Sequence, residues 1–526
     1  MIRWLSAGVI VCLSVFWGQV WGAQPNMIFV LVDDLRFDGM GFVNPALKTP
    51  HIDQLAKSGV YFPNAVVTTS LCSPSRATIL TGMSTRNHKI FDNNNTSEAH
   101  LTFFPSYLQE AGFTTAFVGK WHMGRAKDDP RPGFDHWVSF KGQGFYNPTD
   151  RIPDQMAAAG VRHQLNVNGQ SVPQTGYITD ELTDCALAWL DDVANGNQPF
   201  FLYLSHKAVH SDATPAPRHE GQYAEVDIPL PDPNADAGAP GAGKPMWVHN
   251  QRNSWHGVDF AYHRGEGFAD YVGRYYATLS AVDDSIGRLI KWLGDNDKMD
   301  NTILVFYSDN GFLFGDHGLI DKRNAYEASV RVPMVVWAPG RVDEGQVNRA
   351  RIRNLDLAPT FLDLGGASKP EQMEGQSFKP LLTNKPAQDW DSGDFVYEYY
   401  WEWTFPQTPT TFSITRDEVK YIQYHGLWDL DELYDLKADP QERVNLLHDT
   451  TYRNRLIDLR AALFAALKRP SGEGIVPFSE KRAQGLRFRN RQGSGAAQFP
   501  ESFMKSVDDE GLFEGFMPPA RVEQQQ

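Results

Sequence analysis

The chain has 526 residues, of which 41% are hydrophobic, enough to bury the core of one large domain and a smaller one. Its formal net charge of −15 argues against nucleic acid as a partner, because a polyanion repels so acidic a chain. An anionic substrate would have to be held by local basic groups, not by the overall field.

Residues 1–22 are predicted to be a signal peptide. Arg3 supplies a positive charge, an apolar run extends from Trp4 to Trp21, and cleavage is expected before Ala23. An uncleaved membrane anchor is the alternative, and polar residues within the run disfavour it. No later segment is long and apolar enough to span a bilayer. We therefore expect an exported protein, periplasmic or secreted, with no stable membrane insertion after cleavage.

Continuously apolar runs along the chain predict buried strands, because strands covered on both faces lack polar alternation. Helical periodicity predicts amphipathic helices over 178–193 and 275–295. Strands that alternate with helices indicate an α/β fold, with a large, mixed, mostly parallel sheet sandwiched by helices. The predicted strands are 27–32, 115–118, 200–204, 302–307 and a fifth within 332–340.

The sequence pattern changes twice, once within the first domain, which is expected over residues 23–388, and again after it. Residues 211–265 are rich in Pro, Gly, Ala and Asp and predict a long surface loop whose aromatic residues stack on sugar rings or pack the loop down. Residues 389–468 predict a smaller C-terminal α+β subdomain with a short antiparallel sheet followed by a helix. Residues 469–526 show no core pattern and are expected to be a tail.

Acidic and amide side chains follow two of the predicted strands. Asp33 and Asp34 come after the first strand, and Asp309 and Asn310 come after the fourth. Ligands gather at the carboxyl ends of strands in α/β sheets. Three carboxylates and one amide oxygen suit a hard divalent cation, calcium before magnesium. Alone, each pair is also explained as a helix cap or a turn.

Basic and imidazole side chains follow strands in the same way. Each has an ordinary explanation as a surface lysine or a core histidine, but their shared placement after strand ends suggests a site for an anionic group such as sulfate or phosphate. These candidate residues are Arg76, Lys120, His122, His206, His210, His317 and Lys322.

The cysteines leave several interpretations open. Cys12 lies in the predicted signal peptide, so a disulfide between Cys72 and Cys185 is possible. A cysteine–histidine protease is a second possibility, because a helix N-terminus lowers the pKa of a thiol. A zinc protease fits worse: His206 and His210 have the spacing of H-E-x-x-H but lack its glutamate and follow a strand.

The stretch Leu71–Gly82, LCSPSRATILTG, resembles the signature of the type I sulfatases of the alkaline phosphatase superfamily. Cys72, Pro74, Ser75 and Arg76 meet Cys-x-Pro-Ser-Arg, and Leu-Thr-Gly follows four residues later. Other motifs continue the resemblance in the same order over nearly all of the chain after the signal peptide. They read VDD, GKWH, SHKAVH, SDNG, DKRNAYEASVRVP and ELYDLKADPQERVNL.

This resemblance implies that Cys72 is oxidised to formylglycine by a formylglycine-generating or sulfatase-maturing enzyme. A hydroxyl of its hydrate attacks sulfur, and the second hydroxyl loses its proton to release sulfate. Asp33, Asp34, Asp309, Asn310 and the oxygen at position 72 would hold one Ca²⁺ per chain. The remaining implied roles are Arg76 steadying the diol, Lys120 and Lys322 binding sulfate, His122 accepting the proton, His206 protonating the leaving alcohol, and His210 and His317 lying near the substrate.

The region over 397–426 and the stretch FLYLSHKAVH are similar to sulfatases that act on sulfated sugars, including N-acetylglucosamine-6-sulfatases. The expected activity is therefore removal of O-sulfate from a sulfated carbohydrate, with 6-O-sulfated N-acetylglucosamine or a related glycan as the expected substrate. A phosphodiester or phosphonate monoester hydrolase of the same superfamily is one alternative. An unconverted, catalytically silent homologue that binds glycan is another.

Overall fold

The fold is described from a computed structural model of the chain. No helix within the described residues is long and apolar enough to cross a membrane. The predicted signal peptide and the predicted tail lie outside these residues. The described residues are 24–94, 99–124, 127–232, 243–251, 267–383, 390, 393–402 and 405–468.

A ten-stranded mixed sheet forms the centre of the molecule, in the order β11-β2-β10-β9-β1-β8-β4-β5-β6-β7. The strands β9, β1, β8, β4 and β5 run parallel to one another, and β10 lies antiparallel beside β9. The strands are β1 Asn26–Val32, β2 Val60–Tyr61, β4 Thr114–Gly119, β5 His136–Ser139, β6 Gln164–Val167, β7 Gln170–Pro173, β8 Phe200–Ser205, β9 Thr302–Ser308, β10 Met334–Trp337 and β11 Gln346–Val347.

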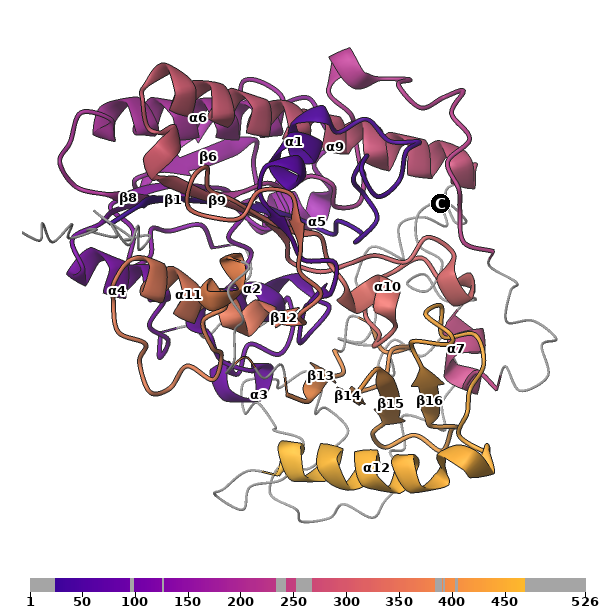
Figure 1. The fold of residues 1–526 in the computed structure, drawn as a ribbon. Helices are drawn as coiled ribbons and strands as arrows, with labels where there is room; N and C mark the ends of the chain where they lie inside the picture. The colour runs from indigo at the N-terminus through magenta and orange to yellow at the C-terminus, as the bar shows by residue number, and fades with distance from the viewer. Residues whose placement is uncertain are drawn as a thin grey trace, which may run out of the picture.

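Helices cover both faces of this sheet (Figure 1). Val30 and Val32 of β1 pack in one core layer with α1, α6 and α9, whereas Phe29 and Leu31 pack in the opposite layer with α2, α4 and α11. Every residue of β1 is buried, which explains why its sequence is continuously apolar after Asn26. The covering helices are α1 Pro50–Lys57, α6 Ile178–Val193 and α9 Phe268–Asp295 on one face, and α2 Cys72–Thr81, α4 Phe104–Glu110 and α11 Leu357–Leu364 on the other.

The structure confirms the predicted α/β fold, with a mostly parallel sheet between helices. Each predicted strand is present, and the helix predicted over 275–295 begins earlier, at Phe268. The predicted loop over 211–265 contains a 3₁₀ turn and α7, while its residues 233–242 and 252–265 lie outside the described residues. Shorter elements are β3 Ala65–Val66, α3 Thr85–His88, α5 Asp154–Ala158, α7 Met246–Gln251, α10 Glu327–Val330 and β12 Ile352–Arg353.

A second, four-stranded antiparallel sheet, β13-β14-β15-β16, follows the large sheet in sequence and carries α12 across it (Figure 1). Lys420 of β15 is fully buried, and its Nζ lies 2.7 Å from Glu327 Oε1 of α10 and 2.8 Å from Glu442 Oε1. This ion pair ties the small sheet to the large domain. The bounds are β13 Phe395–Tyr399, β14 Thr411–Arg416, β15 Val419–Tyr424, β16 Glu432–Asp435 and α12 Arg453–Leu467.

The buried Lys420 gives a prediction for stability. Lys420→Met should lower the free energy of unfolding by about 3–5 kcal/mol, because it leaves the buried Glu442 and the partly buried Glu327 without their cation. Urea unfolding measures this change. Arg416→Met is the matched control: its partners Asp394 and Asp458 lie near the surface, and such pairs contribute about 0–1 kcal/mol. Similar losses for the two variants would contradict the prediction.

Candidate active site

The parallel strands bring the predicted site residues to one edge of the sheet. Val32 of β1 pairs with Ser308 of β9, and Ser205 of β8 pairs with both Leu31 and Gly119. The residues that follow these strand ends therefore emerge side by side, as expected for a ligand site in an α/β sheet. They are Asp33, Asp34, Lys120, His206, Asp309 and Asn310.

Three carboxylates form the centre of the site. Asp33, Asp34 and Asp309 are buried, and one carboxylate oxygen of each lies within 4.8 Å of the others. Asn310 donates from Nδ2 to Asp34 Oδ1 at 2.7 Å, while its buried Oδ1 has no hydrogen-bond partner among the described residues. A buried amide oxygen without a donor, beside three carboxylates, fits a hard divalent cation that prefers oxygen ligands.

The ionisation of these groups reflects their crowding. Burial, together with the charge of Asp33, raises the pKa of Asp309 to about 7. Burial also raises the pKa of Asp34, although Lys322 opposes it. Burial acts in the same direction on Asp33, but Lys120 and other cations outweigh it and hold its pKa well below the usual range. Neighbouring carboxylates in a low-dielectric site need positive charge to remain ionised together.

Cys72 is the first residue of α2 and lies against the carboxylates. Its Sγ is 3.6 Å from Asp33 Oδ1 and 3.2 Å from Lys322 Nζ. Pro74 falls in the first helical turn, where a missing N–H costs nothing. Burial raises the pKa of the Cys72 thiol to about 12, despite two nearby lysines. The thiol is therefore protonated at neutral pH, which disfavours the thiolate chemistry of a cysteine protease.

Arg76 lies one helical turn beyond Cys72 and is buried. Its Nε donates to Asp309 Oδ2 at 2.9 Å, and its Nη1 donates to Ser205 Oγ at 2.7 Å and to the carbonyl of Lys120 at 2.6 Å. One guanidinium thus connects α2 to the ends of β9, β8 and β4. Asp309 raises the pKa of Arg76 against the opposing effect of burial, so this cation stays charged.

Two lysines complete the charge balance. Lys120 forms an ion pair with Asp33, and Lys322 forms one with Asp34. Both ammonium groups also face Cys72, at 3.9 Å and 3.2 Å from Sγ. With Arg76, these lysines supply three positive charges against the three carboxylates.

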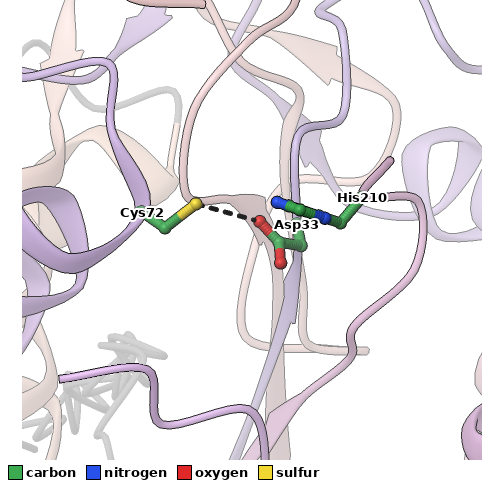
Figure 2. Close-up of side chains that lie close together, drawn as sticks. All are labelled: Asp33, Cys72 and His210. Carbon is green, nitrogen blue, oxygen red and sulfur yellow. Dashed lines mark hydrogen bonds between the residues drawn. The ribbon is translucent and has the colours of Figure 1, made fainter. Parts of the chain in front are cut away.

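His122 and His210 lie at this site. The ring of His210 points toward Asp33 and Cys72 (Figure 2), and its Nε2 is 3.9 Å from Asp34 Oδ2. His122 has a left-handed backbone (φ 56°), and its buried Nδ1 has no hydrogen-bond partner among the described residues. Burial, followed by the charge of Lys120, lowers the pKa of both imidazoles well below the usual range.

His206 does not lie with these groups. It is fully buried, and its Nε2 is 3.2 Å from Ser285 Oγ of α9, on the other face of the sheet from α2. The role predicted for His206, protonation of the leaving alcohol, does not fit this position. The zinc-protease alternative fails for the same reason, because His206 and His210 turn toward different surroundings.

His317 lies in the loop that leads to Lys322. It is buried with its ring 4.1 Å from that of Tyr326, and its backbone is left-handed with φ 56°. Tyr326 belongs to the polar core under the small sheet, where its hydroxyl contacts Glu432 at 3.0 Å. A contact between His317 and the substrate stays a prediction.

The sequence analysis did not single out Lys207 or Tyr146. Lys207 is buried with its ammonium group 4.3 Å from the centre of the Tyr146 ring, and the Tyr146 hydroxyl donates to the carbonyl of His210 at 2.9 Å. Burial, and next the charge of Lys120, lower the pKa of Lys207 to about 8. The available signal was the position of Lys207 between two histidines of SHKAVH.

The two cysteines in the described residues are not paired. Cys72 is buried in the site, and Cys185 is partly buried on α6. Both are free thiols, so the possible Cys72–Cys185 disulfide does not form. Cys72 is therefore available for the chemistry of the site.

Comparison with known protein families identifies the chain. The sulfatase family model matches residues 25–367, and the model of the N-sulphoglucosamine sulphohydrolase C-terminal region matches residues 315–469. The chain belongs to the sulfatase family. It is thereby placed among the sulfuric ester hydrolases, as the resemblance at Cys72 implied.

Proteins named as N-acetylglucosamine-6-sulfatases match most of the chain. The N-acetylglucosamine-6-O-sulfatase of Bacteroides thetaiotaomicron is 31% identical over 498 residues, covering 84% of this chain and 86% of that protein. Human N-acetylglucosamine-6-sulfatase is 29% identical over 486 residues, covering 83% of each chain. A solved structure in complex with its substrate D-glucosamine-2-N,6-O-disulfate is 30% identical, with a TM-score of 0.73, covering 85% of this chain and 98% of that one.

The environment of His206 gives a prediction for pH dependence. Burial lowers the pKa of His206 from 6.5, the value expected in the unfolded chain, to about 4. Above pH 6.5 the ring is neutral in both states and the folded state keeps its full stability. As the pH falls toward 4, the unfolded chain binds a proton that the folded chain does not, and stability is lost. Compared with His206→Gln, the wild type should lose up to about 3 kcal/mol more between pH 7 and pH 4.

Urea unfolding of the two proteins across this pH range measures the difference. His448→Gln, at an exposed position, is the matched control and reports the pH dependence of the rest of the chain. A constant difference between wild type and His206→Gln at every pH would show that His206 is not held neutral by burial.

Proposed function

We propose that this sulfatase removes O-sulfate from a sulfated carbohydrate, with 6-O-sulfated N-acetylglucosamine or a related glycan as substrate. The observation that carries the proposal is the position of Cys72, at the start of α2 and 3.2 Å from Lys322, among three buried carboxylates. The relatives named N-acetylglucosamine-6-sulfatase support the sugar. We further propose conversion of Cys72 to formylglycine and one Ca²⁺ per chain.

The ion would be held by Asp33, Asp34, Asp309, Asn310 and the oxygen of the converted residue at position 72. Its charge would relieve the crowding that raises the pKa of Asp309, and Asn310 Oδ1 would gain a partner. When bound, Ca²⁺ supplies positive charge for sulfate oxygens, and hydrated formylglycine supplies the nucleophilic hydroxyl.

The cations of the chain would hold and orient the anionic sulfate group. Lys120 and Lys322 each make an ion pair with one aspartate and face position 72. With Ca²⁺ bound to the aspartates, both ammonium groups can turn their remaining donors to the sulfate oxygens. Arg76 would keep the side chain at position 72 aligned, because it fixes Asp309 at the end of β9.

His210 takes the role that His206 was expected to have. Its ring faces Asp33 and Cys72, where it can donate a proton to the leaving alcohol as sulfur is attacked (Figure 2). A bound sulfate group would raise the pKa of His210 against the nearby lysines and so favour its charged form. His122, with an unpaired ring nitrogen, would accept the proton from the hydroxyl at position 72 that starts sulfate release.

The organisation of the chain follows the same reasoning. We propose a signal peptide over residues 1–22, a catalytic domain over 23–388, a C-terminal subdomain over 389–468 and a tail over 469–526. The positive residue and apolar run before Ala23 support export to a periplasm or out of the cell.

The proposed activity is tested with 6-O-sulfated N-acetylglucosamine and, in parallel, an aryl phosphodiester. Sulfate release from the sugar, at a higher kcat/KM than hydrolysis of the phosphodiester, is expected. A preference for the phosphodiester would contradict the proposal and favour the related phosphoesterase activity.

The mass of the tryptic peptide that carries position 72 is measured on the same sample by mass spectrometry. Formylglycine lowers its mass by about 18 Da, whereas an unconverted Cys72 without turnover would indicate a silent glycan-binding homologue.

The metal site makes a separate prediction. Removing Ca²⁺ with a chelator during refolding should abolish activity and lower Tm, and added Ca²⁺ should restore both. At 100 times its Kd, a ligand that binds only the folded state stabilises it by about 2.7 kcal/mol. Asp34→Asn should lose most of this response, because it removes one anionic ligand.

Asp449→Asn is the control for this measurement, because Asp449 is exposed and lies before α12, outside the site. It should keep the full Tm response to Ca²⁺. An unchanged response in Asp34→Asn, or full activity of protein shown to be metal-free by elemental analysis, would argue against the proposed ion.

The leaving group distinguishes the two histidines. His210→Ala should lower kcat on a sugar sulfate by about 10²–10⁴-fold and on 4-nitrophenyl sulfate by distinctly less, because nitrophenolate leaves without a proton. His206→Ala is the control: a residue buried against α9 should affect both substrates by the same factor. Equal losses on the two substrates for His210→Ala, with a leaving-group effect for His206→Ala, would restore the original assignment.

A further inference from the structure

A cavity of about 390 Å³ lies outside the site just described, between α7 and the loops of the small sheet. This volume is within the range of small-ligand pockets in proteins. Figure 1 shows α7 beside β15 and β16. The side chains that matter for its chemistry are Trp247, Asn250, Trp401, Gln407 and His425.

The lining has the chemistry of a site for an uncharged sugar. Trp401 is partly exposed and offers aromatic surface, on which the C–H face of a pyranose ring can pack, while Trp247 is buried and forms part of the wall. Asn250 and Gln407 are exposed amides that can both donate to and accept from hydroxyl groups. Among the described residues that line the cavity, none is Asp, Glu, Lys or Arg. The cavity therefore differs sharply from the highly charged site at Cys72.

The cavity is connected to the Cys72 site through a short run of contacts. Trp401 precedes the buried Glu402, whose Oε1 accepts from Arg323 Nε at 2.7 Å. Arg323 follows Lys322, and Lys322 Nζ lies 3.2 Å from Cys72 Sγ. An ion pair and two pairs of sequence neighbours thus connect the wall of the cavity with the Cys72 site.

The cavity wall is also pre-organised. The Trp401 backbone N–H donates to Thr410 Oγ1 at 2.9 Å, and its indole Nε1 donates to the carbonyl of Pro406 at 3.3 Å. Trp247 packs edge-on against Tyr424 of β15, with ring centres 5.0 Å apart. Side chains that are already ordered lose less entropy when a ligand binds.

We propose that this cavity binds an uncharged sugar residue of the same glycan whose sulfated residue lies at Cys72. The inference rests on the proposed carbohydrate sulfatase activity and extends it to the rest of the substrate. It makes Trp401 a specificity residue for glycan length, with no part in the chemical step.

The test compares a sulfated monosaccharide with a tetrasaccharide that carries the same sulfated residue followed by uncharged sugars. Trp401→Ala should raise KM for the tetrasaccharide about two- to tenfold and leave KM for the monosaccharide unchanged. Trp428→Ala is the matched control, because this indole lies three residues after His425 and is fully exposed. It should change neither KM. His425→Gly, at an exposed position of the cavity wall, is a second variant should Trp401→Ala fail to fold.

Calorimetric titration with the desulfated tetrasaccharide tests the cavity without any turnover. The wild type and Trp428→Ala should bind it with the same Kd, and Trp401→Ala should bind it about two- to tenfold more weakly. No binding by the wild type, or equal effects of Trp401→Ala on both sulfated substrates, would overturn the inference. Binding of the uncharged sugar without any sulfate release would instead keep the cavity and reject the proposed activity.

Discussion

The site depends on one buried guanidinium. Arg76 holds Asp309 from the helix side, with Nη2 2.8 Å from Asp309 Oδ2 and 3.8 Å from Asp33 Oδ2. Because Arg76 and Cys72 share α2, the same contacts that neutralise the carboxylates also set the position of Cys72. A charge buried this deeply costs free energy unless it is paired and hydrogen-bonded. Burial of Arg76 on α2 therefore requires its partners at the ends of the strands to be in place at the same time. The remaining contacts of the site follow from this arrangement.

Much of the fold and of the site could be predicted from the sequence. The central strands are buried on both faces, so each is a short apolar run, and the polar residue that ends each run falls at the ligand-binding edge. That reasoning placed Asp33, Asp309 and Lys120 near one another, as the structure shows. The family motif at Cys72 added the start of α2, which periodicity alone would not assign to a site.

The sequence analysis expected His206 at the leaving alcohol, whereas its side chain lies against α9, and the sequence held a signal for this orientation. Side chains alternate between the faces of a strand, and Leu202 and Leu204 of β8 face α6 and α9, whereas Tyr203 faces α2. Continued by two residues, the same alternation turns Ser205 toward Arg76 and His206 toward α9. The orientation of His210 is set by tertiary contacts after the strand, and no local pattern reveals it.

The small sheet is part of the framework of the site as well as its neighbour. Glu398 of β13 donates its backbone N–H to the carbonyl of Thr68, and the Thr69 hydroxyl donates to the carbonyl of Glu398 at 2.7 Å. These contacts hold the segment that leads into α2. From the segment that follows β13, Glu402 fixes Arg323 beside Lys322. Residues far apart in the sequence thus hold in place both the segment that carries Cys72 and the segment that carries Lys322.

The complete burial of Cys72 has a consequence for how the protein is made. Its side chain has no exposed surface, and all of α2 is buried between the sheet and its surroundings. The proposed conversion of Cys72 requires an enzyme to reach a thiol that the folded chain does not expose. Conversion would therefore have to precede the packing of α2, and a chain that folded first would keep its cysteine.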